Sequence, residues 1–378
     1  MKQPLSKIPK LVFLYLTGFS FTGGIEKFNR SFLKALHELS VDGIIDADAI
    51  SSYDVHTDEK YFPRLRFKGF GGKRFWFVTV SILRSLRYQM VVLGHINLAV
   101  VGYVLKRIKP QHKLIIIVHG IEVWREQGYF KKRALQEADS ILSVSHFTKQ
   151  QLLKYNPFLK EEKIRVFPNT IDSYFGLPAS FSKPAYLLER YHIDPTKKIL
   201  VTVTRMAFSE KYKGYDVVLE VMSKLKEKRQ DIVYLICGKA EPQEKARVEE
   251  LIRSYGLEDN VQMTGYVADH ELNDHYLLSD VFVMPSKKEG FGIVFIEALA
   301  CGRRVIAGNK DGSVDALLNG ELGILIDPDH TEELQQAIEQ TLALPVADGM
   351  QLQQQVLSHF GFQRYKQRLK EVLQEIQQ

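Results

Sequence analysis

Short apolar runs alternate with amphipathic segments along most of the chain. Each run has the length of a strand, and the segments between the runs place apolar residues at a helical spacing. Runs that are apolar without interruption suit strands covered on both faces, which is the environment of a parallel sheet. The predicted strands are 11–17, 89–95, 113–120, 140–145 and 163–169, followed by 199–205, 232–238, 260–266, 280–286, 303–308 and 323–328.

The alternation lapses once, between these two groups of runs. Residues 170–198 are rich in proline and serine and show no clear period, so we interpret them as an interdomain linker. A chain of 378 residues is also too long for one ordinary core. The pattern therefore predicts an α/β protein with two Rossmann-like, doubly wound parallel-sheet domains. Their predicted bounds are 1–180 and 181–360, with a C-terminal helix at 361–378 that could pack back on the first domain.

The composition is that of a folded globular protein, with 45% hydrophobic and 25% charged residues. No apolar stretch reaches the roughly 18 residues of a membrane span, and the apolar N-terminus fits a first buried strand better than a signal peptide. Cys237 and Cys301 each lie inside an apolar run, which indicates buried thiols and fits a reducing compartment. The sequence contains no CxxC, no HExxH and no Cys/His cluster, so we expect no bound metal.

Charge is distributed unevenly. Residues 1–185 hold 28 Lys/Arg and 15 Asp/Glu, whereas residues 186–378 hold 23 and 30. Within the first half, residues 60–121 contain twelve basic residues and no acidic one. A field of one sign attracts an anionic membrane surface or a phosphorylated ligand, and the alternative is a solvated basic face.

Ligands of open α/β sheets bind beyond the carboxyl ends of the strands, so the loops after the runs are the candidate sites. Gly23 and Gly24 precede a predicted helix, where backbone N–H groups and the helix dipole favour an anion. The chain has no GxGxxG, and the glycine-rich stretch at 69–73 lacks the ending of a P-loop. These absences argue against dinucleotide and Walker-type sites.

A cluster of cations follows the predicted strand 199–205. Arg205, Lys211 and Lys213 come together there, and such cations would neutralise the negative charge that grows on a departing diphosphate. The alternative is that these are ordinary surface lysines in a loop. The segment lies in the half of the chain that is otherwise net acidic, which favours a binding role.

Two glutamates, Glu289 and Glu297, follow the predicted strand 280–286. We expect Glu289 in the strand-to-helix loop and Glu297 roughly one and a half turns inside the helix, so they should not form a close catalytic pair. Glu289 could accept hydrogen bonds from sugar hydroxyls. Glu297 lies among apolar residues and should bind a donor such as a ribose diol or a backbone amide, because a buried unpaired carboxylate is costly.

With these loops in place, the sequence resembles the glycosyltransferase family 4 enzymes of the GT-B fold, which have two Rossmann-like domains and an interdomain cleft. The most specific piece is the glutamate-x7-glutamate element "EGFGIVFIE", followed by "ALACGRRVIAG". The supporting pieces are "GGIE", "VHG", "SVSHFTKQQL", "VFPNTID", "TRMAFSEKYKGYDVV" and "GYVADHELNDHYLLSDVFVMPS". Together they extend over most of the chain.

The resemblance implies retaining transfer of a hexose-type sugar from a UDP- or GDP-sugar to a hydroxyl of a glycan or lipid-linked acceptor, in surface polysaccharide or glycolipid assembly. The first domain would bind the acceptor and the second the nucleotide-sugar, without metal or cofactor. The resemblance implies catalytic roles for Arg205, Lys213, Glu289 and His119, and donor binding by Gly23, Gly24, Gly290, Phe291, Gly292 and Glu297. In detail, Arg205, Lys213 and the glycine pair would bind the diphosphate, Glu289 and His119 the sugar, and Glu297 the ribose.

The sequence departs from the family pattern after the predicted strand 303–308. Asp315 stands where the family often has a glutamate, which puts the contact geometry there in doubt. His119 could instead be a buried structural histidine. The "DAD" at 46–48 matches a metal-binding DxD, but we discount it because it falls at a predicted strand end, far from the donor loops.

Three alternatives stay open at this point. They are a nucleotide-sugar epimerase or phosphorolytic enzyme of the same fold, a non-catalytic membrane-docking or sugar-binding protein, and a nucleic-acid binder. The last is disfavoured because the chain has no reading motif or aromatic-basic platform. The basic segment 60–121 mixes cations with large apolar groups, which suggests attachment to an anionic membrane. We therefore expect a cytoplasmic protein, peripheral on the inner face of the cell membrane if that segment binds lipid.

Overall fold

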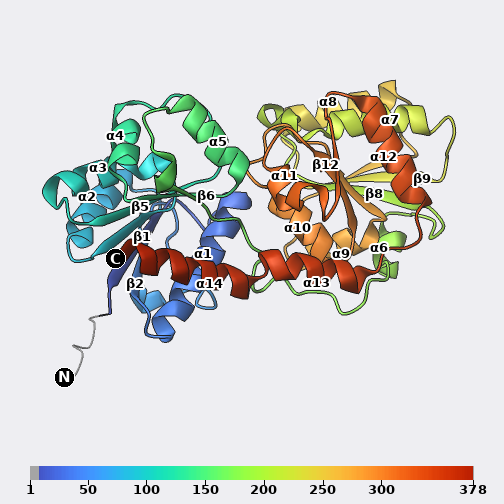
Figure 1. The fold of residues 1–378 in the computed structure, drawn as a ribbon. Coiled ribbons are helices and arrows are strands. Elements are labelled where there is room, and N and C mark those ends of the chain that lie inside the picture. The colour runs from blue at the N-terminus through green and yellow to red at the C-terminus, as the bar shows by residue number, and fades with distance from the viewer. Residues whose placement is uncertain (1–7, 378) are drawn as a thin grey trace. The chain divides into compact units, whose positions relative to one another are not determined.

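The computed structural model describes residues 8–377. The chain forms two compact units (Figure 1). Unit 1 contains the residues up to Ser173 together with those from Phe360 onward, and unit 2 contains Tyr174–His359. The chain therefore leaves unit 1 after its first part and returns to it at the end.

Unit 1 is built on a seven-stranded sheet in the order β3-β2-β1-β4-β5-β6-β7, and every pairing between neighbours is parallel. The strand order reverses between β1 and β4, which makes their carboxyl ends a topological switch point. The strands are β1 (Lys10–Tyr15), β2 (Asp46–Ser51), β3 (Phe67–Gly69), β4 (Met90–Leu93), β5 (Lys113–Val118), β6 (Ser140–Ser143) and β7 (Ile164–Val166).

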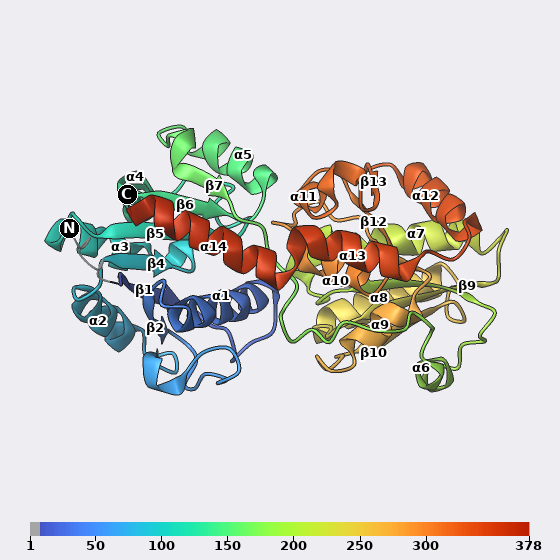
Figure 2. The same cartoon turned by 60° about the horizontal axis from the view of Figure 1, so that its bottom comes forward.

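Helices cover both faces of this sheet. Right-handed crossovers place α1 on one face and the helices that follow β3, β4, β5 and β6 on the other. The last helix of the chain packs against α1, as Figure 2 shows. The helices are α1 (Gly24–Val41), α2 (Arg74–Ser85), α3 (Ala99–Ile108), α4 (Tyr129–Glu137), α5 (His146–Tyr155) and α14 (Phe362–Gln377), with short turns η1 (Arg64–Arg66), η2 (Ile96–Leu98) and η3 (Glu161–Lys163).

α14 is held to unit 1 by an aromatic cluster. Its apolar residues recur at a helical period, and the Tyr365 ring lies 4.6 Å from the ring of Phe167 and 6.2 Å from that of Phe28 on α1. On the same pair of helices, Lys366 lies 2.9 Å from Glu38. The C-terminal residues are thus part of the core of unit 1.

Unit 2 is built on a six-stranded parallel sheet in the order β10-β9-β8-β11-β12-β13. Its order reverses between β8 and β11, which is the switch point of this unit. The strands are β8 (Lys198–Val203), β9 (Ile232–Cys237), β10 (Val261–Gly265), β11 (Val281–Met284), β12 (Arg304–Gly308) and β13 (Ile324–Ile326).

The helices of unit 2 also cover both faces. α7 and α12 contact each other over one face, and α9 and α10 contact each other over the other. The helices are α6 (Ala185–Arg190), α7 (Tyr215–Leu225), α8 (Pro242–Ser254), α9 (Leu272–Leu278), α10 (Ile293–Ala300), α11 (Ser313–Ala316), α12 (Thr331–Ala343) and α13 (Gly349–Phe360), with turns η4 (Phe208–Lys213) and η5 (Leu318–Gly320).

The predicted strands are confirmed, since all eleven apolar runs form parallel strands, although each strand is shorter than its run. Two strands were missed. β2 reads Asp-Ala-Asp-Ala-Ile-Ser, and β3 has only three residues at the sheet edge. The "DAD" at 46–48, expected at a strand end, forms the first residues of β2, at the edge of the sheet opposite to the ligand-binding loops. Asp46 and Asp48 there form ion pairs with Arg66.

Other expectations on the core can be stated against the structure. Residues 170–198, interpreted as an interdomain linker, contain the short helix α6, and those from Tyr174 onward belong to unit 2. Cys237 and Cys301 are free and buried as predicted, and burial raises the pKa of the Cys237 thiol to about 12. Over the described part of the chain, no helix combines the length and the apolar character needed to cross a membrane.

The aromatic cluster under α14 gives a stability test. The Tyr365 ring is buried, while its hydroxyl is also buried and has no hydrogen-bond partner among the described residues. Tyr365→Ala should lower the free energy of unfolding of unit 1 by about 3–5 kcal/mol, because it leaves a cavity. Tyr365→Phe should leave that energy unchanged or raise it, since only an unsatisfied hydroxyl is removed. Urea denaturation followed by circular dichroism measures both, and a large loss in Tyr365→Phe would contradict the assignment.

Candidate active site

Three loops follow the central strands of the unit 2 sheet and form the candidate site. They are residues 204–214 after β8, 285–292 after β11 and 309–312 after β12. Because β8, β11 and β12 are neighbours in the sheet and parallel, these loops leave the same edge side by side.

The centre of the site is an ion pair between Lys213 and Glu289. The Lys213 Nζ contacts the Glu289 Oε1, and the two side chains are only 18% and 14% exposed. Burial alone would lower the pKa of Lys213, but the Glu289 carboxylate outweighs it and the net pKa is raised. Lys213 therefore stays cationic at neutral pH. The sequence named both residues, and the structure brings them together.

Backbone contacts hold the two loops of this pair in register. The Lys287 N–H donates to the Tyr212 carbonyl at 2.9 Å. Gly214 ends η4 with φ at +83°, and a Cβ at this position would collide with the Pro285 carbonyl. Glycine is therefore required where the β8 loop passes the end of β11, and this close passage places Lys213 beside Glu289.

Arg205 follows the same strand but has a different partner. Its guanidinium forms an ion pair with Glu210, and that hydrogen bond raises the pKa of Arg205 further above its ordinary value. The Arg205 side chain is more than half exposed. The structure thus places Arg205 and Lys213 in one loop, with Arg205 at the solvent and Lys213 inside.

The loop that carries Glu289 is anchored by Asp311, which the sequence analysis missed. Asp311 is fully buried, and its Oδ2 accepts hydrogen bonds from the Glu289 N–H at 2.7 Å and the Ser286 hydroxyl at 2.8 Å. Its Oδ1 accepts from the Ser313 N–H at 2.9 Å. In return, the Gly312 N–H donates to the Glu289 carbonyl at 2.8 Å. One carboxylate therefore joins the loops after β11 and β12.

The acid that organises this loop was not among the predicted site residues. Asp315, which we placed at the family glutamate position, lies half-buried in α11, and its N–H donates to the Gly312 carbonyl. The signal for Asp311 was the Asp-Gly-Ser between β12 and α11, since aspartate commonly accepts backbone N–H bonds at a helix start. Burial is the main cause that raises the pKa of Asp311 to about 6, with a smaller contribution from the Glu289 charge.

Gly290, Phe291 and Gly292 lead from Glu289 into α10. Gly292 caps this helix with φ at +86°, and a Cβ there would collide with the Phe295 ring. Gly312 lies so close to the backbone of Gly290 that a Cβ on Gly312 would overlap the Gly290 carbonyl. Phe291 is buried between the two glycines. Gly292 is thus required by the turn itself, and Gly312 by the close approach of its loop to Gly290.

Glu297 lies inside α10, as predicted, and is buried. Its Oε2 accepts a hydrogen bond from the Tyr276 hydroxyl of α9 at 2.8 Å. Burial, and then the Glu297 charge, raise the pKa of Tyr276 well above its ordinary value, so the tyrosine remains a donor. The expected donor was a ribose diol or a backbone amide, and the partner that the structure shows is a tyrosine hydroxyl.

The predicted residues of the first half lie in unit 1. Gly23 caps α1 and Gly24 is its first residue. His119 follows β5, and its Nε2 lies 2.8 Å from the Gly94 carbonyl at the end of β4. The Phe28 ring stands edge-on to the imidazole at 4.9 Å, and burial lowers the His119 pKa. A neutral imidazole in this position donates Nε2–H to Gly94.

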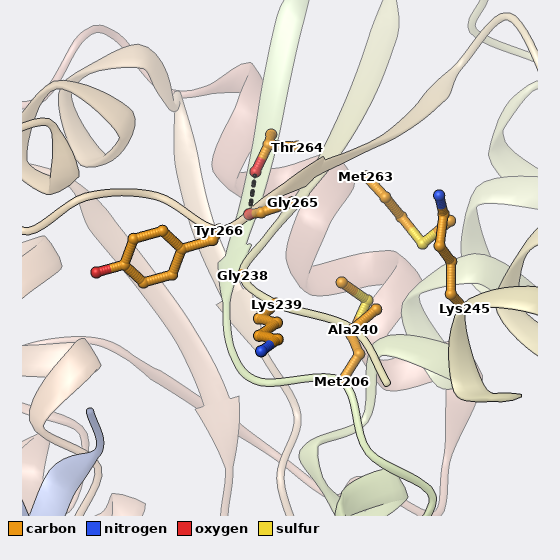
Figure 3. Close-up of a pocket in the computed structure, with 9 residues that line it drawn as sticks. All are labelled: Met206, Gly238, Lys239, Ala240, Lys245, Met263, Thr264, Gly265 and Tyr266. Carbon is orange, nitrogen blue, oxygen red and sulfur yellow. Dashed lines mark hydrogen bonds between the residues drawn. The ribbon is translucent and has the colours of Figure 1, made fainter. Parts of the chain in front are cut away.

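A pocket of about 330 Å³ opens at the carboxyl ends of β8, β9 and β10, and the sequence analysis did not anticipate it (Figure 3). Gly238 is required in its wall, because its φ is +142° and a Cβ would collide with the Thr204 carbonyl. The pocket combines backbone, two thioethers, a tyrosine and two lysines. Its lining residues are Met206, Gly238, Lys239, Ala240, Lys245, Met263, Thr264, Gly265 and Tyr266.

No group of three or more His, Cys, Asp or Glu side chains within residues 8–377 is arranged to hold a metal ion. The acidic side chains of the site are instead bound to Lys213, to backbone N–H groups or to a tyrosine hydroxyl.

Two family models match the chain and together span most of it. The description "Glycosyltransferase Family 4" matches residues 22–174, and "Glycosyl transferases group 1" matches residues 187–356, which includes all three loops of the site. The chain belongs to the family 4 glycosyltransferases. The resemblance drawn from the glutamate-x7-glutamate element is thereby confirmed.

Curated members of family 4 resemble the chain over part of their length. Mannosylfructose-phosphate synthase of Agrobacterium fabrum is 30% identical over 182 residues, which are 47% of this chain and 39% of that protein. The GDP-mannose-dependent alpha-(1-6)-phosphatidylinositol monomannoside mannosyltransferase of Mycolicibacterium smegmatis is 26% identical over 66% of this chain and 65% of its own. The match thus spans less than two thirds of either relative.

The fold is found in solved structures over nearly the full chain. Anabaena HepE, solved in complex with UDP, superposes with a TM-score of 0.78 at 18% identity, covering 97% of this chain and all of that one. At this identity the likeness establishes the fold. It confirms the prediction of a GT-B fold with two Rossmann-like parallel-sheet domains.

The anchor at Asp311 predicts a pH-dependent stability. The folded-state pKa of about 6 lies above the ordinary value of 3.8, so the folded protein binds the proton more tightly, and the stability from Asp311 falls as pH rises through 6. Relative to wild type, Asp311→Asn should gain on the order of 2 kcal/mol between about pH 4.5 and 7.5, because the amide carries no buried charge. Denaturant titrations across this range measure the difference, and a pH-independent difference would contradict the raised pKa.

Proposed function

We propose that this chain moves a hexose-type sugar from a UDP- or GDP-sugar to a hydroxyl of a glycan or lipid-linked acceptor, with retention of configuration. The observation that carries the proposal is the buried pair of Lys213 and Glu289 at the carboxyl edge of the unit 2 sheet. A cation and a carboxylate side by side match the two ends of a glycosyl diphosphate.

Lys213 is the proposed electrostatic catalyst. Its raised pKa keeps the ammonium charged, and its burial gives that charge a larger effect than it would have in water. In the proposed complex the ammonium contacts the diphosphate, and Arg205 adds a second cation from the solvent side of the same loop. The attraction between these two cations and the diphosphate strengthens as negative charge grows on the β-phosphate.

Glu289 is the proposed ligand of the transferred sugar. It is held at the mouth of the loop by Asp311 and by the glycine turn into α10, and its carboxylate can accept hydrogen bonds from sugar hydroxyls. The glycines at 290 and 292 leave backbone N–H groups at a helix start for the same ligand. Glu297 is proposed to bind the ribose, with Tyr276 fixing its orientation.

The pocket between β8 and β10 is the proposed site of the nucleotide base. Its volume of about 330 Å³ lies within the usual range of ligand pockets, and it adjoins the β8 loop that carries Arg205 and Lys213. Two related proteins support a nucleotide donor, since HepE was solved with UDP and the mycobacterial relative is named for GDP-mannose.

Retention is proposed to proceed on one face of the sugar. Glu289 is already paired with Lys213 and Asp311 with backbone N–H groups, so neither carboxylate is placed as a base. In the proposed step the anomeric carbon–oxygen bond to the β-phosphate breaks while the acceptor oxygen bonds to the same face. The acceptor proton passes to the departing phosphate oxygen. The cations of the chain supply the positive charge that this step needs.

The ion pair gives the direct test of the proposed function. Lys213→Ala should lower the turnover number by roughly 10²- to 10³-fold, because one stabilising group for the leaving phosphate is lost. Glu289→Gln should lower it as well. Nucleotide release and product linkage, measured by chromatography and NMR with a panel of UDP- and GDP-sugars, give the rates.

Lys287→Ala is the matched control, because Lys287 lies in the same loop but its ammonium binds Asp329. Wild-type turnover in a folded Lys213→Ala protein would remove Lys213 from the mechanism. Conversion of the donor without an acceptor would identify an epimerase instead.

The base pocket gives a separate test on binding. Ala240→Trp fills the pocket and should raise the dissociation constant of the preferred nucleotide at least about tenfold. Ala343→Trp, at an exposed position on α12, is the control and should leave that constant unchanged. Isothermal calorimetry with UDP and GDP measures both, and unchanged affinity in folded Ala240→Trp would place the base elsewhere.

A further inference from the structure

Helix α2 of unit 1 carries large apolar side chains on both of its faces, and two buried serines, Ser81 and Ser85, on the inner one. One face packs on the core through Phe77, with Val78, Ile82 and Leu86 in partial contact. The opposite face carries Phe75, Trp76 and Leu83, whose side chains are 75%, 58% and 61% exposed. A helix in water normally keeps such a face polar, and an all-round apolar helix is expected to be covered on both sides. The side of α2 that carries Phe75, Trp76 and Leu83 is therefore an apolar surface with no packing partner within the described residues.

The exposed face continues onto the neighbouring helices. α2 contacts α3, and α3 contacts α4, so the three helices lie in a row at one side of unit 1 (Figures 1 and 2). Val100 and Ile108 of α3 are exposed, and so are Tyr129 and Phe130 at the start of α4. The Phe130 ring lies 5.4 Å from that of Tyr103, which ties α4 to α3. We call this row of exposed apolar side chains on α2, α3 and α4 the outer face.

Cations frame the outer face. Lys73 lies just before α2, and Arg84 and Arg87 lie at the other end of this helix. Within residues 8–377, none of these three cations forms an ion pair. Arg107 lies 5.1 Å from the centre of the Tyr103 ring, and Arg133 lies 5.6 Å from that of Tyr129. The segment 60–121, which forms α2, α3 and their connections, contains no acidic residue.

This combination selects one kind of occupant. A second copy of the chain would bring the same cations against these, and the like charges would repel. An anionic bilayer is complementary to the outer face. The lipid headgroups carry the opposite charge, and the membrane interface accepts tryptophan, tyrosine and phenylalanine rings. Trp76 and Tyr129 have the amphipathic character found at membrane interfaces.

We propose that the outer face of α2, α3 and α4 is a docking surface for an anionic lipid bilayer, with Phe75, Trp76 and Leu83 inserted at the headgroup level. Lys73, Arg84 and Arg87 then lie against the lipid phosphates. The surface belongs to unit 1 alone and does not depend on the chemistry proposed for unit 2. Docking would bring the protein to a lipid-linked acceptor, which is one of the two acceptor classes proposed above.

The position of the two tryptophans allows a direct test. Trp76 is exposed on the outer face, whereas Trp124 packs against the core with its ring 5.2 Å from Phe147. In Trp124→Phe, the remaining tryptophan reports on α2. Vesicles of phosphatidylglycerol should shift its emission to the blue and expose it to quenching by brominated lipid. In Trp76→Phe, the same vesicles should change the emission little.

Co-sedimentation with vesicles measures the two parts of the surface separately. Arg84→Gln/Arg87→Gln should lower the partition coefficient about fivefold for each charge removed, and high salt should have a similar effect. Trp76→Ser/Leu83→Ser should lower it at least about tenfold. Lys154→Gln/Lys160→Gln in unit 1 and Leu344→Ser/Val346→Ser in unit 2 are the controls, since all four positions are exposed and outside the outer face. Vesicles of phosphatidylcholine alone should bind weakly.

Three results would overturn the proposal. The first is an unchanged Trp76 emission with phosphatidylglycerol vesicles, and the second is an equal loss of binding in the control variants. The third is self-association without lipid that Trp76→Ser/Leu83→Ser abolishes, which would assign the surface to a second copy. Sugar transfer to a water-soluble acceptor, measured in the same variants, should stay at the wild-type rate. A failure of docking is thereby distinguished from a failure of the proposed activity.

Discussion

A carboxylate with no exposed surface accepts three hydrogen bonds at the carboxyl edge of the unit 2 sheet. The donors are the Ser286 hydroxyl and the backbone N–H groups of Glu289 and Ser313, and they belong to the loops after two neighbouring strands. Without Asp311, both N–H groups would lose their acceptor, and a buried N–H group such as that of Ser313 is rarely left without one. The backbone position of Glu289, the ion-pair partner of Lys213, depends on this one side chain.

The ion pair that Asp311 supports is not explained by stability. Two charges that leave water incur a desolvation cost of several kcal/mol each, and an apolar pair of similar volume would hold the loops together about as well. A charged pair in this position is understandable if a charged ligand is to replace one of its contacts. The close passage of Gly214 past Pro285 and the turn at Gly292 serve the same end, because both are conformations that a side chain would obstruct.

The sequence was informative where the signal was local. Buried strands of a parallel sheet are apolar throughout, so eleven of them could be found from their runs, and the placement of Glu289 in a loop and Glu297 in a helix followed from the next apolar period. β2 was missed because Asp46 and Asp48 interrupt its apolar pattern. Their ion pairs with Arg66 join residues that are distant in the sequence, so no local pattern predicts them. Asp311 and the pocket at the ends of β8, β9 and β10 were missed for the same reason, since each is made by segments that meet only in the folded sheet. The exposed side of α2 could not be predicted either, because an apolar pattern indicates a helix but does not show which of its apolar residues are buried.

The path of the chain has a consequence for the order of folding. Unit 2 is continuous from Tyr174 to His359, whereas unit 1 is closed by α14, whose Tyr365 fills a gap between Phe28 and Phe167. During synthesis from the N-terminus, the seven strands of unit 1 are complete long before α14 has been made. Until then the rings of Phe28 and Phe167 are exposed at the surface of a half-covered sheet. Unit 1 is therefore begun first and completed last. Its sheet lacks α14 for as long as the ribosome needs to translate unit 2.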